Sequence, residues 1–99
     1  MTDTAKILCV EPYETVRESR CAILKYSGFD AASASPQAAE IALRSQKFDL
    51  LVISSVSDSD LQRIVGLSDG AEVLVLDLLV MPSEYLSLVT ARLSRRRRA

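Results

Sequence analysis

Short apolar runs alternate with amphipathic segments along the whole chain. Three runs, 6–10, 48–54 and 72–80, are nearly continuous in apolar residues, as in strands that are buried on both faces of a parallel sheet. Residues 30–34 form a weaker run of small side chains, which fits an edge strand. Between and after these runs, apolar residues recur at helical spacing within 14–27, 36–46, 61–67 and 83–93. Alternating strands and helices of this length predict an α/β fold with right-handed crossovers.

Residues near the ends of the predicted helices supply start and stop signals. Gly28 predicts the end of the first helix, and Ser35 is placed to cap the second helix because a proline follows it. We expect Asp58 and Asp60 to cap the third helix rather than to chelate a cation, since no third carboxylate is anchored beside them. Ser83 is expected to cap the last helix.

The composition is that of one soluble globular domain. Of the 99 residues, 48% are apolar and 25% are charged. The first residues lack the basic stretch and apolar core of a signal peptide, and no apolar run reaches membrane-spanning length. We therefore expect a cytoplasmic protein.

The charge is distributed unevenly, although the formal net charge is only −1. Residues 1–91 hold all 13 acidic residues, whereas 92–99 hold five arginines and no acid. This predicts a domain over 1–93 and a basic C-terminal tail over 94–99. The tail is most simply a solvated helix end, because cations suit that pole of a helix. The alternative is contact of Arg95, Arg96, Arg97 and Arg98 with an acidic partner or nucleic acid; without a groove-reading helix, nucleic acid is the less favoured partner.

Several kinds of catalytic chemistry are excluded by composition. The chain has no histidine, which removes Ser-His-Asp and Cys-His machinery and the usual imidazole metal ligand. Two cysteines are too few for a zinc site or a disulfide scaffold. We expect Cys9 to fill space in a buried strand and Cys21 to be partly exposed on the first helix. Arg20 lies on the apolar face of that helix, and its stem is expected to carry the guanidinium outward.

Five segments together resemble the receiver domain of response regulators. Residues 6–11 resemble its first strand, Tyr26 to Phe29 the end of its first helix, and 44–53 the approach to its phosphorylated aspartate; 73–76 resemble its fourth strand, and Met81-Pro82 the junction before its last helix. The resemblance covers about residues 5–93. It implies a doubly wound, flavodoxin-like parallel sheet in the order 2-1-3-4 and a role in two-component signal transduction, in a response regulator or phosphorelay.

The resemblance also implies a pocket with two metal-binding carboxylates, an acceptor aspartate, a hydroxyl and a lysine. In this sequence the two positions of the carboxylate pair hold Glu11 and Pro12. The acceptor position holds Ser54, the hydroxyl position holds Asp77 and the lysine position holds Met81. A shift of one residue would make Ser55 the acceptor position. Four of the five positions are changed, and we expect no general base beside the serine, so acyl-phosphate chemistry is not expected. We expect no bound metal and no cofactor; a weak Mg²⁺ site at Glu11 and Asp77 is the less favoured alternative.

The segment between the predicted fourth strand and the last helix is too short for a receiver domain. Residues 77–81 leave no room for a crossover helix and a fifth strand, so we expect four strands, with the fourth receiver helix missing. Its loss should uncover apolar surface, which usually marks an interface. The sequence therefore predicts a non-enzymatic pseudo-receiver that acts without phosphorylation by binding a protein partner or itself, as a homodimer. The alternatives are a receiver switched by phosphorylation at Ser54 or Ser55, and nucleic-acid association through the arginines.

Overall fold

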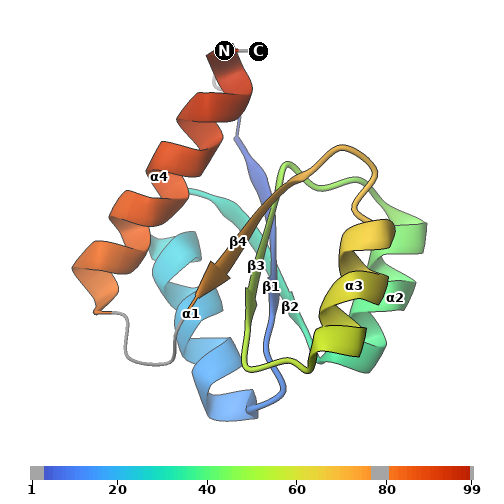
Figure 1. Cartoon of the computed structure of the whole chain (residues 1–99). Helices are drawn as coiled ribbons and strands as arrows, with labels where there is room; N and C mark the ends of the chain where they lie inside the picture. The colour runs from blue at the N-terminus through green and yellow to red at the C-terminus, as the bar shows by residue number, and fades with distance from the viewer. Residues whose placement is uncertain (1–3, 77–80, 99) are drawn as a thin grey trace.

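The computed structural model describes the backbone of residues 4–76 and 81–98. Eight elements alternate along these residues: β1 (Lys6–Val10), α1 (Glu14–Tyr26), β2 (Asp30–Ala34), α2 (Pro36–Ser45), β3 (Leu50–Ser54), α3 (Asp58–Gly66), β4 (Glu72–Leu76) and α4 (Pro82–Arg98) (Figure 1). All four predicted strands and all four predicted helices are present.

The strands form one parallel sheet in the order β2-β1-β3-β4. Lys6 of β1 pairs with Asp30 of β2, and Ile7 of β1 pairs with Leu50 of β3. The predicted four-stranded parallel sheet and its order are therefore confirmed. The part of the predicted run 72–80 that follows Leu76 lies outside the described residues.

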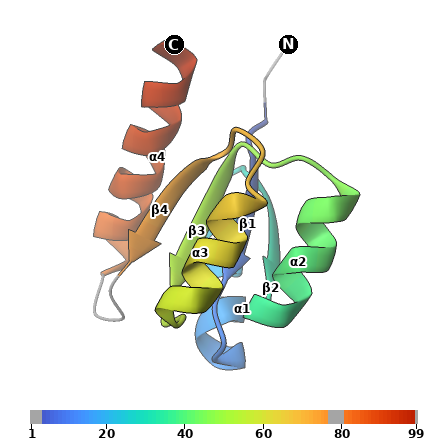
Figure 2. The ribbon, with the colours of Figure 1, turned by 45° about the vertical axis from the view of Figure 1, so that its right-hand side comes forward.

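Helices cover both faces of the sheet. Helices α1 and α4 lie on one face, and α2 and α3 lie on the other (Figures 1 and 2). Successive strand residues point to opposite faces, so Ile7 packs beneath α1 and α4 whereas Leu8 packs beneath α2 and α3. Since both sides of each central strand need apolar side chains, the strands appear in the sequence as continuous apolar runs.

Two of the predicted helix ends are confirmed. The Ser35 hydroxyl accepts a hydrogen bond from the backbone N–H of Ala38 at 3.2 Å. Gly28 has a φ of 96°, and the next residue, Phe29, donates its N–H to the carbonyl of Leu24 at 3.0 Å. A side chain at Gly28 would be strained in this left-handed conformation, which is why glycine ends α1.

Two other capping predictions are wrong. Ser57, not Asp58 or Asp60, caps α3, and its hydroxyl accepts the N–H of Asp60 at 3.2 Å. The aspartates lie inside the first turn, where their charge suits the positive pole of the helix. Ser83 also lies inside the first turn of its helix, because α4 begins at Pro82. Proline suits this first position because the N–H groups of a first helical turn have no partner within the helix.

Helix α4 continues without a break through the arginine-rich end. Its backbone is helical from Pro82 to Arg98, so residues 94–98 extend the last helix; the division into a domain over 1–93 and a tail stays a prediction. Near the end of the stretch of α4 that packs on the sheet, Arg92 donates to the carbonyl of Val73 at 2.8 Å and so fastens the helix to β4. None of the helices within the described residues is both long and apolar enough to cross a membrane.

Candidate functional site

The carboxyl ends of β1 and β3 bring two of the predicted pocket residues together. Val10 pairs with Ile53 across the two strands, so the residues that follow them, Glu11 and Ser54, are neighbours at this end of the sheet. Both are almost fully buried, with 1% and 2% of their surface exposed. The Ser54 hydroxyl donates to Oε1 of Glu11 at 3.0 Å. A carboxylate therefore lies within hydrogen-bond distance of this serine, contrary to the sequence-based expectation.

Arg20 is the third member of this buried group, and the prediction that it reaches outward is wrong. Its side chain is only 8% exposed, and Nη1 donates to the hydroxyl oxygen of Ser54. Arg20 lies one helical turn before the fully buried Leu24, on the face of α1 that packs against the sheet. The stem therefore points inward, and the guanidinium reaches the strand ends, where polar acceptors satisfy it. We call Glu11, Ser54 and Arg20 the Arg20 cluster.

Hydrogen bonds from the chain hold the Glu11 carboxylate in place. Its Oε2 accepts the backbone N–H of Tyr13 at 3.1 Å, while Oε1 accepts the Ser54 hydroxyl. Arg17 donates to the backbone carbonyl of Glu11 at 3.0 Å, which fixes the turn between β1 and α1. Among the described residues, every buried side-chain nitrogen and oxygen has a hydrogen-bond partner. The cluster is thus a satisfied polar core in an apolar surround.

Tyr85 of α4 connects the cluster to the last helix. The Arg20 Cζ lies 6.0 Å from the centroid of the Tyr85 ring, at the outer limit of a cation–π contact. The Tyr85 hydroxyl and the Cys9 sulfur are 3.5 Å apart. Burial raises the pKa of the Cys9 thiol to about 11 and also raises the pKa of the Tyr85 phenol. Both groups are therefore neutral at physiological pH, and neither is an activated nucleophile.

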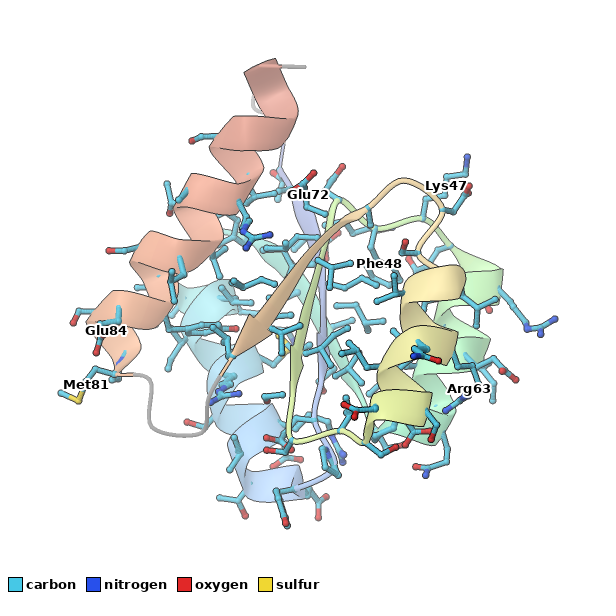
Figure 3. All side chains as sticks on the ribbon, in the orientation of Figure 1. Lys47, Phe48, Arg63, Glu72, Met81 and Glu84 are labelled. Atoms are coloured by element: carbon cyan, nitrogen blue, oxygen red, sulfur yellow. The ribbon has the colours of Figure 1, made fainter. Side chains whose placement is uncertain are left out.

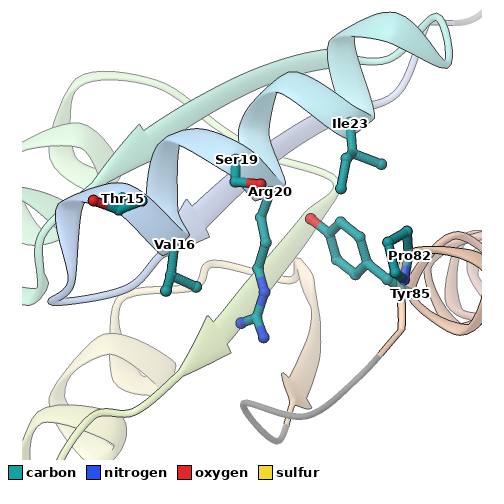
Figure 4. A pocket seen from close by; sticks show the side chains of 7 residues that line it. All are labelled: Thr15, Val16, Ser19, Arg20, Ile23, Pro82 and Tyr85. Atoms are coloured by element: carbon teal, nitrogen blue, oxygen red, sulfur yellow. The ribbon is translucent and has the colours of Figure 1, made fainter.

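A cleft of about 250 Å³ lies between α1 and the start of α4. It is lined by Thr15, Val16, Ser19, Arg20, Ile23, Pro82 and Tyr85 (Figure 4). Figure 4 shows Arg20 extending from α1 between Val16 and Tyr85. Among the described residues that line this cleft there is no acidic side chain, and beside Arg20 they contribute small hydroxyls and apolar walls.

The other predicted pocket positions are exposed or lie outside the described residues. Pro12 is exposed, and Met81 points away from the body at the start of α4 (Figure 3). Ser55 is exposed with a φ of 61°, whereas Ser54 is buried beside Glu11. Asp77 lies outside the described residues, as do the side chains of Arg95, Arg96, Arg97 and Arg98, whose backbone is helical.

The donor set of the cluster does not suit Mg²⁺. It offers one carboxylate and one neutral hydroxyl, and it adds a guanidinium, which repels a cation. Within the part of the chain that the structure describes, no three acidic or cysteine side chains gather as a metal site would require. A Mg²⁺ ion therefore has no set of hard oxygen ligands at the described strand ends.

Sequence reasoning missed Arg20 as a member of the site and expected Cys21 to be partly exposed. The prediction for Cys21 is wrong, because this residue is buried. Cys9 is also buried, and there the prediction is confirmed. The available signal for Arg20 was a single cation within the apolar stripe of the first helix. That pattern fits an outward or an inward guanidinium equally well, because the choice depends on acceptors contributed by β1 and β3.

Solved structures with the same fold are receiver domains. A CheY-like response regulator receiver domain protein from Methanospirillum hungatei matches with a TM-score of 0.72 and 13% identity, over 97% of this chain and 98% of that one. The receiver domain of a signal transduction histidine kinase from Syntrophus aciditrophicus matches with a TM-score of 0.70 and 17% identity, over 97% and 95%. Chemotaxis protein CheY4 of Vibrio cholerae matches with a TM-score of 0.65 and 16% identity, over 91% and 99%. The sequence itself matches no protein-family model and no curated protein. These likenesses establish a receiver-type fold.

Proposed function

We propose that this chain is a degenerate receiver domain that acts in signal transduction as a protein-interaction module, without being phosphorylated. The carrying observation is the state of Ser54, the residue that the sequence resemblance assigns to the acceptor position, which is buried between Arg20 and Glu11. A receiver needs an exposed carboxylate there, because an acyl phosphate forms on carboxylate oxygen. Ser54 is 2% exposed and its hydroxyl is hydrogen-bonded to both Arg20 and Glu11, so the phosphorus atom of a phosphodonor cannot reach its oxygen in this conformation. We propose no catalytic activity for the chain.

One observation favours a second candidate function. Glu11 lies 3.0 Å from the Ser54 oxygen and has the geometry of a general base. Opening of the cluster would expose a serine beside a carboxylate that accepts its proton, and a kinase could then phosphorylate it. Ser55, which is exposed, is the alternative acceptor of the same kind.

Mass spectrometry of the intact protein tests the proposal. The protein is incubated with acetyl phosphate and Mg²⁺, alongside Ser54→Ala and the matched control Ser55→Ala. We expect no phosphoryl adduct on any of the three. An adduct on the wild type that disappears in Ser54→Ala and persists in Ser55→Ala would overturn the proposal in favour of a phosphorylated receiver.

We further propose that the interaction surface includes β4 and that the chain pairs with itself. Strand β4 is at one end of the described sheet, and the side chain of Val75 is 57% exposed there. Val65 of α3 is a further exposed apolar side chain of the same domain. Exposed apolar side chains on the strand at the end of a sheet are typical of an association surface.

Light scattering on a sizing column tests the homodimer. We expect a dimer at both low and high salt, since apolar contacts are insensitive to screening. Val75→Glu should yield monomer, whereas Ile41→Glu, at an even more exposed apolar position on α2, should leave the dimer intact. A wild-type monomer at both salt concentrations would contradict self-association and leave another protein as the partner.

Nucleic-acid binding and location complete the proposal. We expect no binding of a labelled duplex; binding that weakens steeply with salt and disappears on removal of residues 95–98 would instead identify a nucleic-acid partner. We also propose a cytoplasmic location, which the two free, buried cysteines support because reducing compartments keep thiols unpaired.

A further inference from the structure

The Arg20 cluster contains two opposite charges that are both withdrawn from water. Glu11 is 1% exposed and Arg20 is 8% exposed, and the Ser54 hydroxyl bridges them by donating to one and accepting from the other. A buried carboxylate is costly unless a positive charge or several donors compensate it. The compensating cation in this pocket is part of the chain itself.

We propose that the Arg20 guanidinium occupies the place at these strand ends that a divalent cation would otherwise fill, and that this arginine keeps Mg²⁺ out of the pocket. Ligands of open parallel sheets bind outside the carboxyl ends of the strands, where Glu11 and Ser54 lie. Arg20 reaches this place from α1 and takes the Ser54 oxygen as its acceptor. The inference rests on the proposed function, since it treats the site as one that needs no metal-dependent phosphorylation.

The surroundings of Arg20 hold the guanidinium in this position. Its stem lies in the cleft between α1 and α4, beside the Tyr85 ring, whose centroid is 6.0 Å from Cζ. Tyr85 is itself 2% exposed, so the ring beside the arginine is as withdrawn from solvent as the guanidinium's stem. A free cation equilibrates with solvent, but this one is tethered, so the charge state of the pocket is the same whatever the metal concentration.

Changing the charges one at a time gives a direct test. Ser54→Asp adds a second carboxylate and keeps Arg20, while Ser54→Asp with Arg20→Met keeps both carboxylates and removes the guanidinium. Ser54→Asn is the neutral control of similar shape. Thermal unfolding is followed in MnCl₂ and in NaCl of equal ionic strength.

We expect Mn²⁺ to raise the Tm of the double variant only. When the Mn²⁺ concentration is tenfold above the dissociation constant of Mn²⁺ for the double variant, the Tm should rise by roughly 5 °C or more. The wild type, Ser54→Asn and Ser54→Asp should show the same Tm in both salts. Ser54→Asp should be at least as stable as Ser54→Asn, because its carboxylate meets Arg20.

Three results would overturn the inference. The first is a Mn²⁺-dependent rise in Tm for the wild type or for Ser54→Asp, and the second is a folded double variant that ignores Mn²⁺. The third is Mn²⁺-induced broadening of the wild-type amide signals of Glu11 and Ser54. If the double variant does not fold, Ser54→Asp and the amide signals decide the matter without it. None of these measurements uses a phosphodonor, so their failure is distinct from failure of the proposed function.

Discussion

Helix α3 packs on the sheet around one fully buried side chain, and removing that side chain gives a sharp test of the packing. Ile64 is the single fully buried residue of α3, at 0% exposure, and it packs in the layer that contains Leu51 and Ile53. Ile64→Ala removes buried apolar volume and leaves a cavity, at a cost of about 2–5 kcal/mol. A domain of this size has a total stability of about 5–15 kcal/mol, so the variant should lose a large share of it. The neighbouring Val65 is partly exposed, and Val65→Ala should cost less than about 1 kcal/mol.

Urea unfolding followed by far-UV circular dichroism measures both variants. We expect a clear drop in the midpoint for Ile64→Ala at an unchanged dependence on urea, and a near wild-type curve for Val65→Ala. The expected loss corresponds to a fall in Tm of roughly 10–25 °C. Equal costs for the two variants, or a greater cost for Val65→Ala, would refute the assignment of Ile64 as the anchor of α3.

Three further predictions concern single groups elsewhere in the fold. Since burial raises the pKa of Cys9 from 9.0 to about 11, the unfolded chain loses this proton first, and stability should fall as pH rises from about 9 to about 11. Urea midpoints across that range should fall less steeply in Cys9→Ala, and an unchanged slope would contradict this. Ser57→Ala should lose about 1 kcal/mol in urea unfolding by removing the cap of α3, whereas Ser87→Ala on exposed α4 surface should lose almost nothing. Arg92→Ala frees the carbonyl of Val73, so light scattering should show more association at high concentration than for Arg44→Ala; equal behaviour would show that Arg92 does not shield β4.

The fold was predictable because the strands and helices carry strong local patterns. The runs 6–10 and 48–54 are apolar throughout, as the two central strands of a covered parallel sheet must be. Even the weak run 30–34 could be placed, because a strand beside β1 with small side chains fits an edge position. Parallel strands with helical crossovers then leave few possible orders.

The candidate site was only half predictable. Glu11 and Ser54 follow strands, so their proximity at one end of the sheet comes from the topology. The inward direction of the Arg20 side chain does not follow from the topology. The apolar stripe of a helix indicates which face a residue lies on, but it does not indicate where the end of a long cationic side chain lies. The cap of α3 failed for a similar reason: Ser57, Asp58 and Asp60 all have capping side chains, and the backbone geometry at Ser57 decides among them.

The all-parallel pairing of the sheet has a consequence for how the chain folds. Strand β1 is the first to be synthesised, yet it lies in the interior of the sheet between β2 and β3. The four described strands form no hairpin that could start the sheet, because each of their pairings must wait for a crossover helix. Glu11 is made early, but its partner Ser54 comes from the far end of β3. The cluster therefore forms only when distant segments have met, and loop closure should make folding slower than in a helical bundle of the same length. A nascent chain that ends before β3 leaves one side of β1 unpaired, and it should depend on prompt completion of the domain to avoid association.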